Sequence, residues 1–186
     1  GAMSDPYNPF ERELCLTRHA LELIHAYSCG VAAATKSDLI LRDAGLYRDI
    51  QSQAPVVCKL TVTTADDALA AKIEPRAPSP SRRLAAVEGL AKEGIFTGVL
   101  LMPVLPFVED SWENVRSVTE AAARAGAKFV YAAFGVTMRD GQRDYFLDGL
   151  DRAFPGQGLG ERYRTRYGLR YQCVSPRARA LWEQFS

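Results

Sequence analysis

The stretch from Val56 to Ala86 constrains the fold of this chain most, because it begins with a strand, to Thr64, that turns hydroxyl-rich only at its end. A short helix and a Pro-rich loop are predicted to follow this strand. The strand ends in three threonines, Thr61, Thr63 and Thr64. A strand of this kind is typical of a parallel sheet, in which both faces are buried and the carboxyl end of the strand faces a ligand crevice. A plainer interpretation stays open beside it: the threonines cap a following helix, and the arginines of the next, Pro-rich loop are solvated.

Apolar strands and helical patterns alternate along the chain, which predicts an α/β fold with a parallel sheet and right-handed crossovers. No G-x-G-x-x-G motif follows a strand and no G-K-[ST] phosphate loop occurs, so a barrel or part-barrel is favoured over a nucleotide-binding fold. We therefore expect consecutive strand order with the helices on one outer face. Asp110 and Glu113 are predicted to form a capping box, and a fifth strand is a candidate ending at Met3 or Ser4. Strands are predicted at 31–35, 56–64, 96–104 and 129–134, and helices at 10–27, 37–50, 84–93, 110–126 and 139–154.

The composition excludes several classes of protein. A chain of 186 residues with 47% hydrophobic residues can bury one substantial core. A net charge of +1 argues against a general attraction to nucleic acids or membranes, and no apolar run reaches membrane-spanning length. The cysteines form no C-x2-C or C-x3-C pair, which predicts no metal site within this chain and a reduced, cytoplasmic protein. They stand far apart, at Cys15, Cys29, Cys58 and Cys173.

The segment after the last predicted helix has a different character. We expect residues 1–154 to form the barrel unit and residues 155–186 a basic extension that packs on it. From Arg152 to the end there are seven arginines and two glutamates, a net charge of +5. Tyrosines interleave with the arginines, a pattern that can hold phosphates and stack bases but is more often a solvated tail. These tyrosines are Tyr163, Tyr167 and Tyr171.

A succession of motifs resembles the spore photoproduct lyase-like branch of the radical SAM superfamily, whose bacterial members are often labelled DNA repair photolyases. The most specific is E-P-R-A-P-S-P with the following R-R-L, at 74–84. The others are S-D-P-Y-N-P at 4–9, A-T-K at 34–36, T-V-T-T at 61–64 and M-P-V-L-P at 102–106. The resemblance covers nearly the whole chain and implies a partial, TIM-like (β/α) barrel. It also implies a [4Fe–4S] cluster on C-x3-C-x2-C and S-adenosylmethionine as cofactors.

The chain departs from the family at its start, because the three cluster cysteines are absent. The resemblance therefore implies a fragment that spans strands two to six of the barrel and is open at its N-terminal edge. An open edge of this kind invites dimerisation. We expect the isolated chain to bind no cluster and to be inactive.

The resemblance also implies roles for six residues. Lys36 would pair with the carboxylate of S-adenosylmethionine, and Ser4 and Asp5 would receive its amino group. Thr61 and Thr63 would bond to its carboxylate or ribose, and Met102 would lie against the adenine. Each has a plainer alternative: a lysine beside a helix, an aspartate in a turn, threonines that fit a strand. Arg76 and Arg83 are expected to brace their loop.

Two functions follow for the whole protein. The first is a radical SAM enzyme, lyase-like, that cleaves S-adenosylmethionine and acts on an unknown substrate, with nucleic acid as a candidate. The alternative is a non-catalytic α/β domain that binds nucleic acid or a protein partner through its basic tail.

Overall fold

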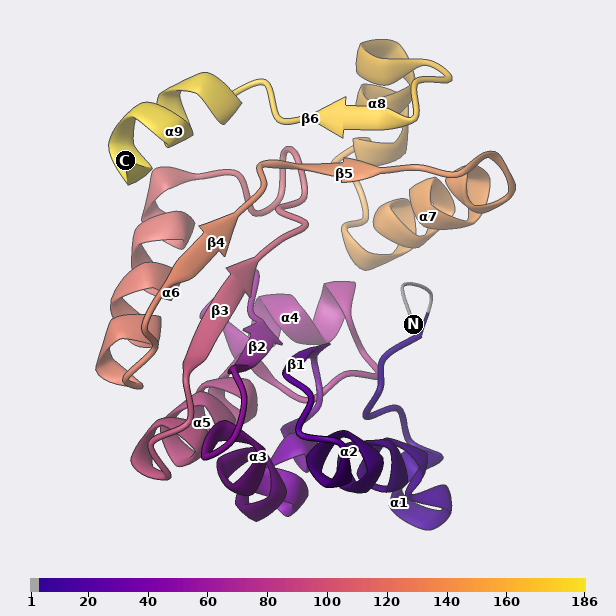
Figure 1. Ribbon diagram of the computed structural model, residues 1–186. Coiled ribbons are helices and arrows are strands. Elements are labelled where there is room, and N and C mark those ends of the chain that lie inside the picture. The colour runs from indigo at the N-terminus through magenta and orange to yellow at the C-terminus, as the bar shows by residue number, and fades with distance from the viewer. Residues whose placement is uncertain (1–3) are drawn as a thin grey trace.

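The computed structural model describes residues 4–186, apart from the side chain of Asp140. Its centre is a parallel sheet in the order β1-β2-β3-β4 (Figure 1). The predicted α/β class, the parallel pairing and the consecutive order of the strands are confirmed. The first strand has its predicted bounds, and the other three are shorter than predicted: β1 (Val31–Thr35), β2 (Val56–Thr61), β3 (Thr97–Leu101) and β4 (Val130–Ala132).

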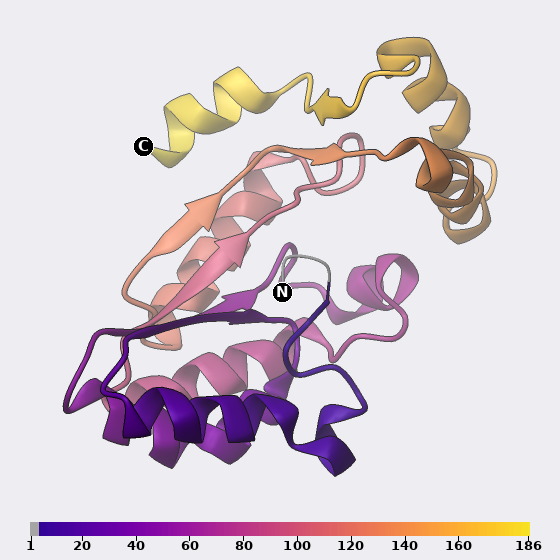
Figure 2. The same cartoon turned by 45° about the vertical axis from the view of Figure 1, so that its right-hand side comes forward.

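One face of the sheet is covered by helices. Ala33, Leu60 and Val99 point toward these helices and are buried in the main core. Figure 2 shows α2, α3, α5 and α6 on this side of the strands. Two helices precede β1, α1 (Glu11–Leu14) and α2 (Leu16–Ala26). The helices between the strands, in chain order, are the 3-10 helix η1 (Asp38–Asp43), α3 (Ala44–Gln51), α4 (Asp67–Ile73), α5 (Pro80–Lys92) and α6 (Trp112–Arg124).

The opposite face of the sheet is open. Ala34 and Tyr131 are exposed there, and Lys59 and Leu100 are half-buried. No strand within residues 4–186 pairs with the free edge of β1. Of the candidate fifth strand, Met3 lies outside the described residues, and Ser4 is in a bend rather than a strand.

The first predicted helix is divided in the structure for a tertiary reason. The helix expected over 10–27 is broken at Cys15, which has a left-handed φ of 51°. The Glu11 carboxylate of α1 reaches forward past this break and accepts the backbone N–H of Thr17 at 3.0 Å, so it caps the start of α2.

The capping box predicted from Asp110 and Glu113 is wrong. Ser111 caps α6 instead, since its hydroxyl accepts the N–H of Asn114 at 3.1 Å. Asp110 is used elsewhere: its carboxylate accepts the hydroxyl of Ser175 at 2.5 Å.

After β4 the chain leaves the parallel sheet, and only its last helix packs again on the main core. β5 and β6 pair antiparallel, and α7 and α8 share a second apolar cluster, which includes Leu147, Leu159 and Tyr163. α9 then packs back on the main core, with Trp182 against Phe134. The division of the chain at residue 154 stays a prediction. None of the helices described is long and apolar enough to cross a membrane. The elements of this part are β5 (Gly135–Thr137), α7 (Asp140–Ala153), α8 (Leu159–Tyr167), β6 (Gln172–Val174) and α9 (Ala178–Phe185).

Candidate functional site

The first group of the candidate site lies where β1 ends. Asp5, in the turn that opens the described chain, fastens this turn to the strand end. Its Oδ1 accepts the hydroxyl of Thr35 at 2.5 Å and the N–H of Tyr7 at 2.8 Å, and its Oδ2 accepts the N–H of Lys36 at 2.8 Å. The aspartate therefore holds the backbone from which the Lys36 side chain extends.

Lys36 is the first member of an ion-pair chain, Lys36–Glu74–Arg83. Its ammonium bonds to Oε1 of Glu74, and Oε2 of Glu74 accepts the Arg83 guanidinium at 2.7 Å. Arg83 is 1% exposed and also donates to the carbonyls of Thr61 at 3.0 Å and Pro78 at 2.7 Å. The expectation that Arg83 braces its loop is thus confirmed, and the ion-pair chain ties β1, the Pro-rich loop and the end of β2 together.

The electrostatics of Glu74 follow from this position. Burial alone would raise the pKa of its carboxyl, but the charges and hydrogen bonds of Lys36 and Arg83 outweigh burial and lower the pKa below its usual value. Glu74 is therefore ionised at neutral pH.

A second carboxyl, Glu109, lies beside the end of β2 and is 1% exposed. Its Oε2 accepts the N–H of Leu105 at 2.9 Å, whereas its Oε1 is buried and has no hydrogen-bond partner among the described residues. Burial raises the pKa of this carboxyl to about 7, and the Glu74 charge acts in the same direction, while the Thr63 hydroxyl and Lys36 oppose it. Asn114 holds the neighbouring backbone, since its amide donates to the carbonyls of Thr63 at 2.8 Å and Glu109 at 2.9 Å.

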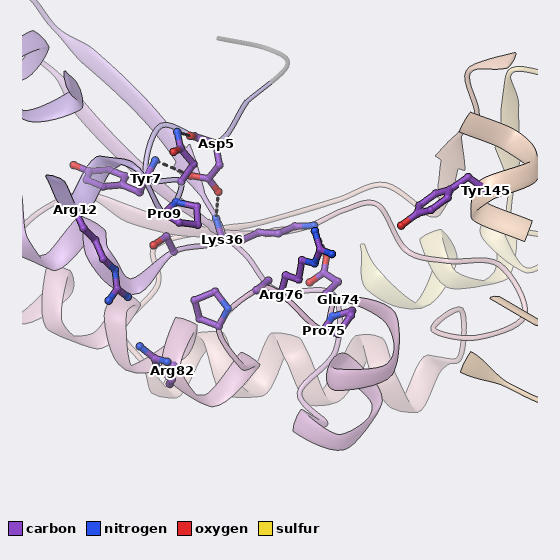
Figure 3. Close-up of a pocket in the computed structure, with 14 residues that line it drawn as sticks. Asp5, Tyr7, Pro9, Arg12, Lys36, Glu74, Pro75, Arg76, Arg82 and Tyr145 are labelled. Atoms are coloured by element: carbon purple, nitrogen blue, oxygen red, sulfur yellow. Dashed lines mark hydrogen bonds and ion pairs between the residues drawn. The ribbon is translucent and has the colours of Figure 1, made fainter. Parts of the chain in front are cut away.

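A cavity of about 780 Å³ opens next to the ion-pair chain (Figure 3). In Figure 3 the Lys36 side chain extends from the end of β1 toward Glu74 and Arg76, and Tyr145 faces them from the opposite side. Pro75 and Tyr145 also line a second cavity, of about 620 Å³, so the two adjoin. The second cavity is mainly apolar and is lined by Ile73, Leu105, Phe146, Leu150 and Ala153, among others.

The structure brings some of the six sequence-predicted residues together and not others. Asp5, Lys36 and Thr61 belong to one bonded network, and Thr63 adjoins Glu109. Ser4 is exposed and lines a different cavity, of about 580 Å³, beside β1 and α2. Met102 is half-buried after β3, at a cis peptide bond to Pro103, and does not line the cavity next to Lys36.

Sequence reasoning missed Glu109 and assigned no role to Glu74. The available signal for Glu109 was an acidic pair after an apolar strand, at 109–110, but one member was explained as a helix cap. The signal for Glu74 was its place in the E-P-R motif.

The basic C-terminal segment exposes fewer tyrosine rings for base stacking than its composition suggested. Tyr163 and Tyr167 are buried, and their hydroxyls donate to the carbonyls of Pro106 at 3.0 Å and Val174 at 2.7 Å. Only Tyr171 among these three is exposed. Base stacking on the other two would require the second apolar cluster to open.

The described residues contain no group of three or more His, Cys, Asp or Glu side chains that could hold a metal ion. All four cysteines are free thiols, and two of them, Cys58 and Cys173, are buried.

Comparison with known proteins finds relatives in bacteria, archaea and a virus. The chain is 31% identical over 167 residues to uncharacterized protein Rv2578c of Mycobacterium tuberculosis, covering 90% of this chain and 48% of the relative. It is 33% identical over 110 residues to uncharacterized protein MJ0683 of Methanocaldococcus jannaschii, covering 59% of this chain and 41% of the relative. It is 28% identical over 134 residues to uncharacterized protein ORF301 of Acidianus two-tailed virus, covering 69% of this chain and 44% of the relative. No family model and no solved structure matches. The chain spans about half the length of these relatives.

Proposed function

We propose that this chain is the S-adenosylmethionine-binding part of a radical SAM enzyme of the spore photoproduct lyase-like branch. The observation that carries the proposal is the placement of Lys36 and its ion-pair partner Glu74 beside a cavity at the carboxyl end of a parallel sheet. Consecutive strand order with helices on one face supports a partial (β/α) barrel, because a doubly wound sheet has helices on both faces. The motifs at 4–9, 34–36, 61–64, 74–84 and 102–106 supply the family resemblance.

The residues present fit one cofactor of such an enzyme and not the other. An amino-acid zwitterion needs a cation and an anion within ion-pair reach, and Lys36 and Glu74 supply them. The cluster would need three thiolates at the proper spacing, and the described residues do not supply them. In the whole protein the cluster ligands would come from residues outside this chain.

The substrate is proposed only as a class. Nucleic acid remains the candidate that the resemblance implies, and the alternative function, a non-catalytic binding domain, would use the basic segment after Arg152. The burial of Tyr163 and Tyr167 counts against base stacking in both cases. A dimer through the free edge of β1 is also a proposal.

The proposed activity has a direct test in the whole protein that contains this chain. After anaerobic reconstitution with iron and sulfide, we expect reduction to convert S-adenosylmethionine to 5′-deoxyadenosine, measured by chromatography. A whole protein that lacks C-x3-C-x2-C, forms no such product and binds nucleic acid would contradict the enzyme and favour the binding domain. The same protein with its cluster cysteines replaced by alanine serves as the control.

Lys36→Ala should weaken S-adenosylmethionine binding to the whole protein by about 1–3 kcal/mol, the scale of a lost charge-assisted hydrogen bond. Titration calorimetry measures the effect. Lys92→Ala is a matched control, because Lys92 forms an exposed ion pair with Glu88 within α5 and does not line the cavity. Equal affinities of the Lys36→Ala variant and the unmodified protein would remove Lys36 from the site.

A further inference from the structure

The carboxylate of Asp5 is largely engaged within the protein. Three donors, the Thr35 hydroxyl and the N–H groups of Tyr7 and Lys36, already bond to its two oxygens. A carboxylate has about four acceptor positions, so one is left. A ligand that took Asp5 as its main anion would compete with the bonds that hold the end of β1.

Glu74 is placed differently. Its Oε2 is fixed by the buried Arg83, while its Oε1 bonds only to the ammonium of Lys36 among the described residues. The Lys36 side chain is 35% exposed and that of Glu74 19% exposed, and both line the cavity of about 780 Å³. The lowered pKa of Glu74 keeps its charge available at neutral pH.

We propose that Glu74, and not Asp5, receives the amino group of the ligand in this cavity. Without the ligand, the Lys36 ammonium occupies the same position on Oε1 of Glu74. The identity of the ligand as S-adenosylmethionine rests on the proposed function. On binding, the ligand's amino group replaces the Lys36 ammonium on Oε1 of Glu74, and Lys36 turns to the ligand's carboxylate. One ion pair is thereby exchanged for two, which offsets the cost of separating Lys36 from Glu74.

The position of Arg83 makes this exchange feasible. Because Arg83 is fixed by the carbonyls of Thr61 and Pro78, it keeps Glu74 in place when Lys36 leaves. Lys36, in contrast, has a flexible side chain, and only its backbone is held by Asp5. The mobile partner of Glu74 is thus the one at the cavity, and the rigid partner lies behind it.

The test uses the chain of 186 residues and compares two probes by titration calorimetry. The probes are S-adenosylmethionine and 5′-methylthioadenosine, which lacks the amino-acid portion. Glu74→Gln should weaken binding of the first by about tenfold to a hundredfold, the range for a lost hydrogen bond to a charged group. It should leave the affinity for the second unchanged. Asp38→Asn is the matched control, because it removes a carboxylate that pairs with Arg82 near the same cavity without lining it.

The outcomes separate the inference from the proposed function. Unchanged S-adenosylmethionine affinity in Glu74→Gln, or equal weakening for both probes, overturns the role of Glu74 and leaves the proposed function standing. Absence of S-adenosylmethionine binding to the unmodified chain and to the reconstituted whole protein overturns both.

A second measurement does not depend on the folding of the variant. The unmodified chain is titrated with an S-adenosylmethionine analogue whose amino group is replaced by hydrogen. We expect this analogue to bind about tenfold to a hundredfold more weakly than S-adenosylmethionine. Equal affinity of the two compounds would overturn the inference.

Discussion

Replacing Arg83 with alanine is expected to lower the free energy of unfolding by about 3–5 kcal/mol, the scale for removing one partner of a buried ion pair. Arg83 is 1% exposed, and its loss would leave the Thr61 and Pro78 carbonyls without their donor and Glu74 with one cation fewer. Chemical denaturation followed by circular dichroism measures the change.

The neighbouring arginine is the control. Arg82 forms an ion pair with Asp38, and its side chain is 58% exposed. An exposed pair contributes roughly 0–1 kcal/mol, so Arg82→Ala should change stability by no more than that. If both variants lose the same amount, burial of the Arg83 guanidinium is not what stabilises this loop.

Replacing Glu109 with glutamine is expected to remove a pH dependence of stability. In the folded protein the pKa of Glu109 is raised from 4.5 to about 7, so between these values the unfolded chain ionises and the folded protein holds its proton. Stability from this group is therefore fully present below pH 4.5 and is lost as the pH rises to about 7. The loss is on the order of 3 kcal/mol.

Glutamine imitates the protonated carboxyl, so Glu109→Gln should match the unmodified protein near pH 4.5 and exceed it in stability at pH 8. Denaturation curves across this range measure the difference. Glu113→Gln is the matched control, since Glu113 is exposed in the first turn of α6. Parallel pH profiles for the unmodified protein and Glu109→Gln would show that Glu109 does not titrate in this range.

The sheet could be predicted from sequence because its signal is local. The run 56–61 is apolar apart from Lys59 and Thr61, and its Val56, Cys58 and Leu60 are buried on the face that the helices cover. Helix starts were less predictable where distant residues compete. Asp110 precedes a helix and has the composition of a cap, but Ser175 engages it from 65 positions along the chain, and Ser111 caps instead.

The residues of the candidate site also fall into those that the sequence predicted and those that it did not. Lys36 was proposed for the site from the resemblance of the A-T-K motif at 34–36, and it follows a predicted strand directly. Glu109 was missed because its importance comes from the burial of its unpartnered Oε1, and the residues next to it in sequence do not predict that burial. The burial of Tyr163 likewise comes from packing against Phe107, a residue of another segment, with ring centroids 5.4 Å apart. Composition alone could only describe that segment as basic and aromatic.

The excursion of the chain after β4 has an evolutionary consequence. It begins after Phe134 and ends at Ser175, and the N–H of Ser175 donates to the carbonyl of Phe134 at 3.0 Å, so its two ends meet. A segment whose ends meet can be lengthened, shortened or exchanged at little cost to the body that carries it. This segment contributes Tyr145, Phe146 and Leu150 to the walls of the two adjoining cavities. A change in this segment would therefore alter one wall of the two cavities and leave the contacts among Lys36, Glu74 and Arg83 in place.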